Sequence, residues 1–381
     1  MLSPQSKPHP TAATAVAPLP LVTVGLSGGV DSSVAALLLM RQGYTVAGMF
    51  MKNWQEQDPL HPCTAAEDAI DAKAVCRRLG ITFNGINFSA EYWQRVFQQF
   101  LGEYAQGRTP NPDILCNKEI KFRVFLDHAL AQGADLIATG HYARIGKENG
   151  RYLLLQGIDA GKDQSYFLYT LGQDQLAKTL FPLGHLRKTE VRRIAAEAGL
   201  SNHDKKDSTG ICFIGERNFR TFLLHYFKPD PGNICTPEGV VMGEHEGLAF
   251  YTIGQRQGLG IGGKRMSDGR PWYVAGKDTA TNTLFVVQGH DHHALFTSGL
   301  TADRLHWVAG HPPQVPYRCQ AKTRYRQPAQ PCDITAMESE HCHVVFDSPQ
   351  WAVTPGQAVV FYDGERCLGG GTIDATAQSL A

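Results

Sequence analysis

The stretch Gly25–Ser32 (GLSGGVDS) has the composition of a loop that binds phosphate. It separates a short apolar run from a helical pattern, so its glycines let the backbone approach a phosphate and the first amides of the helix supply donors. It lacks both the Gly-Lys-Ser/Thr ending of a Walker loop and the Gly-x-Gly-x-x-Gly pattern of a dinucleotide fold, which disfavours kinase-like transfer of a γ-phosphate. The alternative is an ordinary turn in which Asp31 or Ser32 caps the helix.

Two residues near this loop have further predicted roles. Asp31 could hold Mg²⁺ against a pyrophosphate, because a hard cation prefers oxygen ligands. Met51 ends the next expected strand, where the topology of an α/β sheet would place it near an adenine. Burial of Met51 in the core is an equally good interpretation.

Two cysteines lie in segments that favour a reactive thiol. Cys116 follows Thr109–Leu115 (TPNPDIL), whose prolines and Asn-Asp pair predict a loop before a helix that starts at Lys121. A helix N-terminus and nearby lysines would lower the pKa of that thiol. Cys212 lies between two glycines in Lys205–Arg217 (KKDSTGICFIGER), which indicates a mobile loop with a reactive thiol. Burial as a small apolar side chain is the alternative, and it is the prediction for the other cysteines.

Composition limits the class of protein. Lys plus Arg (36) equals Asp plus Glu (36), so local patches must hold any polyanion. No apolar run approaches the roughly 20 residues that cross a bilayer. The nine cysteines form no C-x-x-C pair, which favours free thiols in a reducing cytoplasm over disulfides or structural zinc. We predict no resident metal site, no membrane contact and a disordered tail over residues 1–20.

Alternating strand and helix patterns up to Thr139 predict a parallel sheet with helices on both faces. Such a sheet binds ligands beyond the carboxyl ends of its strands. The expected strands are residues 21–26, 44–51, 81–88 and 135–139, and the expected helices are residues 34–42, 65–79, 92–105 and 121–132.

The pattern changes near Pro229 to short apolar runs broken by Gly, Pro, Asn and Asp. The last such stretch, Tyr317–Ile373, is typical of a small antiparallel barrel or sandwich. We place boundaries near residues 218 and 293, which predicts domains over residues 21–218, 219–292 and 293–381.

Basic residues alternate with other side chains in Lys322–Arg326 (KTRYR). In a strand, Lys322, Arg324 and Arg326 would share one face and contact RNA phosphates, with Tyr325 on the other face. A solvated strand edge is the alternative.

Many segments between about Val24 and Gly371 resemble, in the same order, the bacterial tRNA-specific 2-thiouridylases, a family of PP-loop ATP pyrophosphatases. The segments are GLSGGVDSS, MFMKNW, AEYW, GRTPNPDILCNKEIKF, ATGHYAR, KDQSYFLY, KKDSTGICFIGER, GQRQGLGIGG, PWYV, KTRYRQ and VTPGQAVVFY. The resemblance implies a PP-loop α/β domain, a small central domain and a C-terminal antiparallel β-barrel that binds tRNA.

The resemblance also implies roles for matching residues. The nucleotide-binding residues would be Gly25, Leu26, Ser27, Gly28, Gly29, Val30, Asp31, Ser32, Met51 and Gly140. Asn111, Pro112 and Asp113 would contact the target base, with Asp113 a candidate acid or base. Cys116 would be the nucleophile and Cys212 the persulfide carrier. Further tRNA contacts would be His141, Lys162, Asp163, Gln164, Arg324, Tyr325 and Gln357.

The implied reaction uses ATP with Mg²⁺ to adenylate the C2 oxygen of the wobble uridine of tRNA. Sulfur then replaces that oxygen, and AMP is the leaving group. A persulfide donor or relay protein would load Cys212, and attack by Cys116 would release the sulfur and leave a transient disulfide. Direct attack by the persulfide and prior release of sulfide both remain open.

Two other classes of protein fit part of this pattern. An amidotransferase-type synthetase or argininosuccinate-like ligase would use the glycine loop but would not need two reactive cysteines. A non-catalytic tRNA-binding or sulfur-carrier protein would leave the loop unused.

Overall fold

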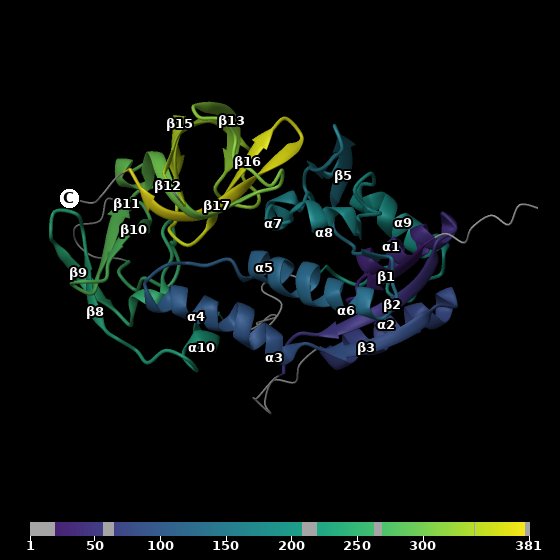
Figure 1. Cartoon of the computed structure of the whole chain (residues 1–381). Helices are drawn as coiled ribbons and strands as arrows, with labels where there is room; N and C mark the ends of the chain where they lie inside the picture. Colours follow the sequence, from purple (N-terminus) through teal and green to yellow (C-terminus); the bar gives the residue numbers. More distant parts are fainter. Residues whose placement is uncertain (1–19, 56–64, 208–218, 263–268, 339, 378–381) are drawn as a thin grey trace, which may run out of the picture.

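The computed structural model describes residues 20–55, 65–207, 219–262, 269–338 and 340–377. Figure 1 shows a layered α/β part at the right, a small sheet at the left and a barrel at the top. The predicted tail up to residue 19 and the cysteines at positions 63 and 212 lie outside the described residues.

A five-stranded parallel sheet forms the α/β part, as predicted. Its order is β3-β2-β1-β4-β7, and every neighbouring pair is parallel. The strands are β1 (Leu21–Gly25), β2 (Thr45–Lys52), β3 (Thr82–Asn87), β4 (Leu136–Ala138) and β7 (Thr179–Leu180). The carboxyl ends of β1, β2 and β4 therefore meet at one edge of the sheet.

Helices cover both faces of this sheet because successive strand residues point to opposite sides. Val24 and Ala138 pack on one face with α1 (Val30–Arg41) and α2 (Ala65–Leu79), and α9 (Lys188–Glu197) packs against α1. Ile137, next to Ala138, belongs to the core on the other face. The expected bounds of α2 are confirmed residue for residue.

The helix expected from Lys121 begins at Pro112, so the predicted loop around Cys116 was wrong. The run consists of α5 (Pro112–Leu115), the π-helical η2 (Cys116–Val124) and α6 (Phe125–Ala131). Asn111 Oδ1 accepts the backbone N–H of Asp113 at 3.1 Å, and a proline at the first helical position sacrifices no hydrogen bond. The Asn-Pro-Asp sequence starts the helix rather than preventing it.

The helix expected over residues 92–105 is present as an interrupted run that begins three residues earlier and has a π-helical turn in its middle. The hairpin and two short helices that follow β4 were not predicted individually. The elements of the interrupted run and of this later segment are α3 (Ser89–Tyr92), η1 (Trp93–Phe97), α4 (Gln98–Ala105), β5 (Ala143–Glu148), β6 (Arg151–Gln156), α7 (Ser165–Leu168) and α8 (Gln173–Ala177).

The small sheet has the order β10-β11-β8-β9. Its buried side chains include Ile234, Val274 and Leu284. The elements of this part are α10 (Phe219–Leu223), β8 (Gly232–Cys235), β9 (Val241–His245), η3 (Leu248–Phe250), β10 (Trp272–Asp278), β11 (Thr283–Gln288) and η4 (His293–Leu295).

The C-terminal strands form a closed antiparallel barrel. The predicted barrel is therefore confirmed, and the sandwich alternative is wrong. The order is β12-β15-β14-β13-β16-β17, and β12 also pairs with β17. The strands are β12 (Phe296–Trp307), β13 (Tyr317–Lys322), β14 (Gln330–Glu338), β15 (His341–Trp351), β16 (Ala358–Asp363) and β17 (Arg366–Thr376). The hairpin strand β6 adds to β17, which joins the barrel to the α/β part.

The predicted strand face of Lys322, Arg324 and Arg326 does not form. β13 ends at Lys322, and Thr323 starts a turn in which Gln327 Oε1 accepts both its backbone N–H and its hydroxyl. These hydrogen bonds to the Gln327 side chain take the place of the hydrogen bonds between strands. The basic side chains therefore do not alternate across a sheet.

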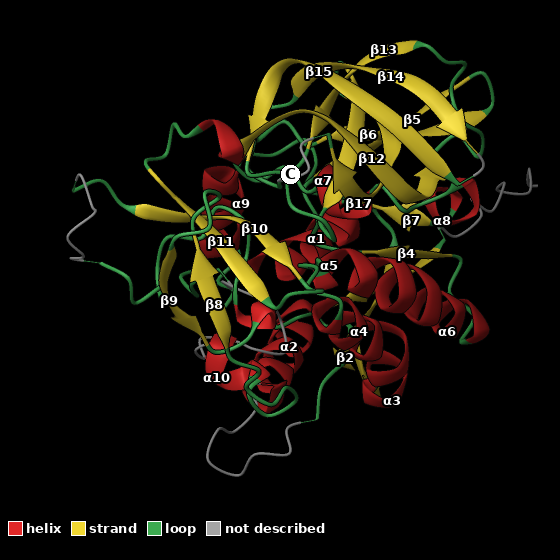
Figure 2. Cartoon of the chain, turned by 90° about the vertical axis from the view of Figure 1, so that its left-hand side faces the viewer, coloured by secondary structure: helices red, strands yellow, loops and turns green. Residues whose placement is uncertain are grey.

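The segment between α4 and α5 fastens the three parts together. In the rotated view of Figure 2, the small sheet lies at the left, the barrel at the top, and α4 and α5 below the barrel. The backbone N–H of Thr109 donates to Pro355 O at 3.0 Å, and Lys277 Nζ donates to Gly107 O at 2.9 Å. Arg108 pairs with Asp374 at 2.9 Å. The start of α5 is thus held by both the small sheet and the barrel.

Replacing Asn111 tests whether its side-chain cap determines that the helix starts at Pro112. Asn111→Ala should lower the free energy of unfolding by about 0.5–2 kcal/mol, because a backbone N–H loses its acceptor. Asn111→Ser should retain most of the stability, since serine caps nearly as well. Urea unfolding followed by circular dichroism measures both, and equal stability of all three proteins would contradict the capping role.

Candidate functional site

The glycine loop joins β1 to α1 in the geometry of a phosphate cradle. Gly28 has φ +76°, and a Cβ there would lie 2.5 Å from the backbone oxygen of Asp68. Gly29 is the N-cap residue of α1 and no side chain caps the helix, which argues against the ordinary-turn alternative. The Ser32 and Ser33 hydroxyls instead donate to Gly29 O. The N-terminal amides of this twelve-residue helix are therefore left for another acceptor.

The other predicted nucleotide-binding residues gather around the same strand ends. A Cβ on Gly140, just beyond β4, would lie 2.6 Å from the backbone nitrogen of Ser32, so only glycine permits this approach to α1. A Cβ on Gly25 would lie 3.2 Å from Met51 Cε. The sequence prediction that these residues share one edge of the sheet agrees with the geometry.

Asp31 in the first turn of α1 is bound by two side chains that the sequence did not reveal. Tyr142 donates its hydroxyl to Asp31 Oδ1 at 2.7 Å, and Lys188 Nζ lies 2.8 Å from both carboxylate oxygens. Burial, and then the Asp31 charge, raise the pKa of Tyr142, so this phenol remains a donor. Lys188 thus places a cation beside the first turn of α1.

Lys188 also binds a second carboxylate. Its Nζ lies 2.7 Å from Asp207, which is held in addition by Lys162 at 2.6 Å and Arg192 at 2.9 Å. Burial by itself would raise the pKa of Asp207, but hydrogen bonds from Lys162 and Lys188 lower it to about 2. Asp207 is the last described residue before the segment that carries Cys212.

The position of Lys188 at the start of a helix is a sequence signal that could have indicated its contact with carboxylates. It is the first residue of α9, where the helix dipole disfavours a cation. Two carboxylates offset this cost. A basic residue at a predicted helix start therefore indicates an anionic neighbour.

Asp113 and Cys116 lie three residues apart on one helical run and so on one face of it. Burial raises the pKa of the Asp113 carboxyl, with Lys121 opposing the shift. The raised pKa favours the protonated form of Asp113 relative to an exposed aspartate. The thiol of Cys116 is buried near the helix start, and Cys212 lies outside the described residues.

Of four predicted tRNA contacts, His141 and Asp163 are buried, and Lys162 and Gln164 are partly exposed. His141 is 8% exposed, its Nδ1 lies 2.7 Å from Thr139 Oγ1, and burial followed by Lys121 holds its pKa well below the usual range. Asp163 is 5% exposed and accepts the backbone N–H groups of residues 157 and 165. Gln164 Oε1 accepts the backbone N–H of Tyr142 at 3.0 Å. These three side chains are positioned to support neighbouring groups, and Lys162 is half-buried on Asp207.

The remaining predicted tRNA contacts lie at the barrel. Arg324 Nη2 donates to the backbone oxygens of residues 253 and 352, and its guanidinium lies 5.2 Å from the ring centroid of Trp351. The Tyr325 ring lies 4.3 Å from that of Phe167. Gln357 Nε2 donates to Thr109 O at 2.7 Å. Gln357 thus contacts the segment that leads into α5, and Arg324 joins the barrel to the small sheet.

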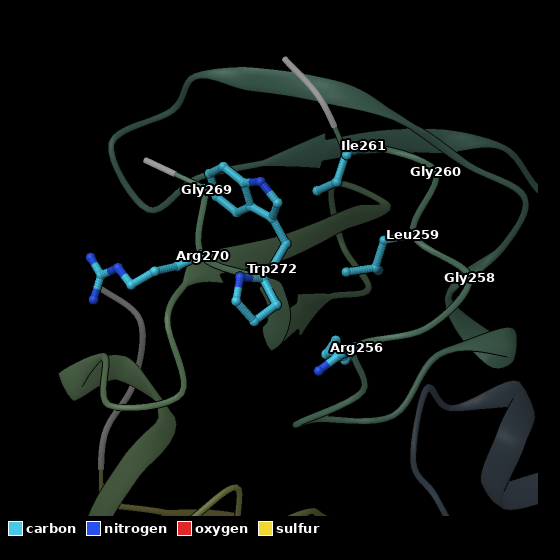
Figure 3. A pocket seen from close by; sticks show the side chains of 10 residues that line it. Arg256, Gly258, Leu259, Gly260, Ile261, Gly269, Arg270 and Trp272 are labelled. Carbon is cyan, nitrogen blue, oxygen red and sulfur yellow. The ribbon is translucent and has the colours of Figure 1, made fainter. Parts of the chain in front are cut away.

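A separate cavity of about 600 Å³ lies on the small sheet (Figure 3). In that view the indole of Trp272 lies between Gly269 and Ile261, and Arg270 points away from it. Arg270 pairs with Asp291 at 3.3 Å. None of the predicted site residues lines this cavity, so its size does not identify it with the phosphate loop.

Within the described part of the chain, no helix is both long and apolar enough to cross a bilayer.

Family models match all three parts of the chain. A model described as the tRNA methyl transferase HUP domain matches residues 21–216, and the tRNA methyl transferase PRC-barrel domain matches residues 220–288. An aminomethyltransferase β-barrel domain matches residues 297–373.

Several curated relatives are named tRNA-specific 2-thiouridylase MnmA. The protein of Methylococcus capsulatus is 64% identical over 94% of this chain and 97% of its own length. The chain belongs to the tRNA-specific 2-thiouridylase family. The relatives from Nitrosococcus oceani (61% identical, 94% of this chain and 97% of the relative) and Methylobacillus flagellatus (60%, 92% and 98%) agree. Membership in the 2-thiouridylase family confirms the resemblance and the predicted class of enzyme, a tRNA sulfurtransferase.

The lowered pKa of Asp207 predicts a pH-dependent contribution to stability. A carboxylate with a depressed pKa stabilises the fold above its unfolded pKa of about 3.9, and this stabilisation is lost as the pH falls through about 2. Asp207→Asn should therefore lower the free energy of unfolding by about 1–2 kcal/mol at pH 7, with partial solvent screening included.

Urea titrations between pH 7 and pH 2.5 measure this difference, with the exposed Asp204→Asn as the matched control. The difference between wild type and Asp207→Asn should shrink below about pH 4. A difference that grows as the pH falls would contradict the assignment.

Proposed function

We propose that this chain catalyses the ATP-dependent 2-thiolation of the wobble uridine of tRNA in the cytoplasm. The observation that carries the proposal is the uncapped N-terminus of α1 with Lys188 beside it, in a chain of the 2-thiouridylase family. Uridine, ATP and a persulfide sulfur would give 2-thiouridine, AMP and pyrophosphate.

The glycine loop would hold the β- and γ-phosphates of ATP. The free amides at the start of α1 and the helix dipole favour an anion there, and Lys188 would add a positive charge. The carboxylate of Asp31 offers the oxygen ligands that Mg²⁺ prefers. Lys188 contacts both of these oxygens in this structure, so Asp31 would hold the ion in exchange for Lys188, and the ion would neutralise charge on the pyrophosphate. Met51 and Gly140 would line the nucleotide site.

In the first step, the C2 oxygen of uridine would attack the α-phosphorus of ATP and release pyrophosphate. Asn111, Pro112 and Asp113 would face the target base. The raised pKa of Asp113 suits it to hold or return a proton at the base during adenylation.

In the second step, sulfur from a persulfide on Cys212 would bond to C2, and AMP would depart with the former C2 oxygen. Attack of the Cys116 thiolate on Cys212 Sγ would break its bond to the outer sulfur and form a disulfide between the two cysteines. A cellular thiol would reduce this disulfide, and a persulfide donor or relay protein would reload Cys212.

The direct assay combines the protein with unmodified tRNA, ATP, Mg²⁺ and a persulfide donor, and measures 2-thiouridine and the nucleotide product. AMP formed in equal amount to 2-thiouridine is expected. ADP in place of AMP would contradict adenylation, and AMP without thiolation would favour a ligase.

Cys212→Ser should lower the rate of thiolation at least about a hundredfold, because the sulfur carrier is lost. The affinity for tRNA should stay within about twofold of that of the wild type. Cys235→Ser, a cysteine of the small sheet, is the control and should thiolate normally. Mass spectrometry of digested tRNA gives the yield, and normal thiolation by Cys212→Ser would rule out its role as carrier.

Lys188→Met should raise the KM for ATP by about tenfold or more, because a phosphate contact and the partner of Asp31 are lost together. Lys188→Arg keeps the charge and should retain most of the affinity. Calorimetric titration with ATP provides a second readout, and unchanged ATP affinity in Lys188→Met would show that Lys188 does not serve the phosphates.

A further inference from the structure

The side chain of Asn202 contacts the glycine loop from a turn that follows α9. It is 3% exposed, and its Nδ2 donates to Gly28 O and to Ser33 Oγ, each at 2.9 Å. Asn202 is not among the predicted site residues, and 174 positions separate it from Gly28. One buried amide therefore joins the loop to a distant part of the chain.

The Oδ1 atom of Asn202 is left unpaired by this arrangement. It is buried, and among the described residues it has no hydrogen-bond partner. A buried acceptor without a donor destabilises the fold, so the two N–H groups are placed on the loop at a cost in stability. Such a local cost is typical of functional sites and uncommon in purely structural contacts.

The turn that carries Asn202 is anchored next to the loop. Arg192 donates to two backbone oxygens of the same turn, at 3.0 and 3.1 Å. Lys205 Nζ lies 2.8 Å from Asp68 Oδ1 in α2. The backbone oxygen of Asp68 is also the atom that a Cβ on Gly28 would meet at 2.5 Å. Gly28 thus lies between α2 and the Asn202 turn, and the turn has a fixed position relative to the loop.

The peptide unit between Gly28 and Gly29 is the part of the loop that Asn202 orients. In a trans peptide the C=O and N–H groups point in opposite directions, so an amide that holds Gly28 O also sets the direction of the Gly29 N–H. That N–H lies 3.4 Å from the hydroxyl of the exposed Ser27, which is the long limit of a hydrogen bond. A phosphate oxygen would readily replace this hydroxyl as the acceptor.

The next carbonyl of the loop is held in a similar way. Gly29 O accepts the hydroxyls of Ser32 and Ser33 at 3.1 and 2.9 Å, and Ser33 Oγ in turn accepts Asn202 Nδ2. Asn202 therefore binds Gly28 O directly and acts on Gly29 O through Ser33. Both carbonyl dipoles, which would repel a phosphate, are bound by donors of the protein, and the N–H groups at the start of α1 remain for the anion.

We propose that Asn202 is a positioning residue of the phosphate loop, whose amide fixes the Gly28–Gly29 peptide in the orientation that binds the pyrophosphate part of ATP. The inference rests on the proposed function, since it needs ATP as the substrate. Both ends of α9 then serve the loop, because Lys188 at its first residue contacts Asp31 and Asn202 follows its last turn.

Two substitutions that remove the N–H groups of Asn202 test the proposal. Leucine is larger than asparagine and serine is smaller, so an effect that Asn202→Leu and Asn202→Ser share comes from the lost donors. The affinities for ATP and for inorganic pyrophosphate should fall about tenfold, because the loop would be in the binding orientation only part of the time. The affinity for AMP, which lacks the two phosphates that the loop would hold, should stay within about twofold.

A matched control removes the same kind of contact far from the loop. Asn282 in the small sheet donates its Nδ2 to the backbone oxygens of Asp230 and Pro231, at 3.2 and 3.1 Å. Its φ of +50° suits glycine, so Asn282→Gly loses these hydrogen bonds without backbone strain. This variant should bind ATP, pyrophosphate and AMP as the wild type does.

Calorimetric titrations with ATP and Mg²⁺, with pyrophosphate and with AMP measure the dissociation constants, and circular dichroism checks that each variant is folded. Loss of ATP and pyrophosphate affinity with AMP affinity retained supports the proposal, and Asn202→Ser carries the comparison if Asn202→Leu does not fold. An equal loss for AMP, or unchanged ATP affinity in a folded variant of Asn202, would overturn it. Absence of ATP binding by the wild type would overturn the proposed function itself, which distinguishes the two failures.

Discussion

The contact of Lys188 with two carboxylates is the interaction on which the candidate site depends. Asp31 belongs to the first turn after the glycine loop, and Asp207 precedes the segment of the predicted sulfur carrier, so one ammonium group joins the two. Removing Lys188 would take the cation away from the partly buried Asp31 carboxylate, whereas Asp207 would keep Lys162 and Arg192. The packing of α9 against α1 places Lys188 between the two carboxylates.

A second constraint acts at the other end of the site. Residues 107–109 are hydrogen-bonded to the barrel and to the small sheet, and the capped helix that carries Asp113 and Cys116 begins directly after them. The three parts of the chain therefore meet at the segment predicted to receive the target base. This arrangement gives the barrel and the small sheet a direct influence on the helix with the candidate acid and nucleophile.

The sequence predicted what local patterns determine. The parallel sheet and α2 followed from strand-like runs that alternate with helical patterns, and the phosphate loop followed from its glycines. Lys188 could not be predicted to contact Asp31, because residues 157 positions apart meet only through tertiary packing. The predicted strand over Lys322–Arg326 is wrong because the Gln327 side chain binds Thr323 and ends the strand there. The predicted start of the helix at Lys121 is wrong because Asn-Pro-Asp, which can form a loop, here caps and starts the helix. The assigned roles of individual site residues remain predictions.

The central claim is that ATP converts the C2 oxygen of uridine into part of a leaving group. Preparing tRNA with ¹⁸O at C2 of the target uridine and following that atom by mass spectrometry during thiolation tests the claim most directly. The ¹⁸O should appear in the phosphate of AMP, one atom for each 2-thiouridine formed. Label recovered in water or in inorganic phosphate, with unlabelled AMP, would contradict it.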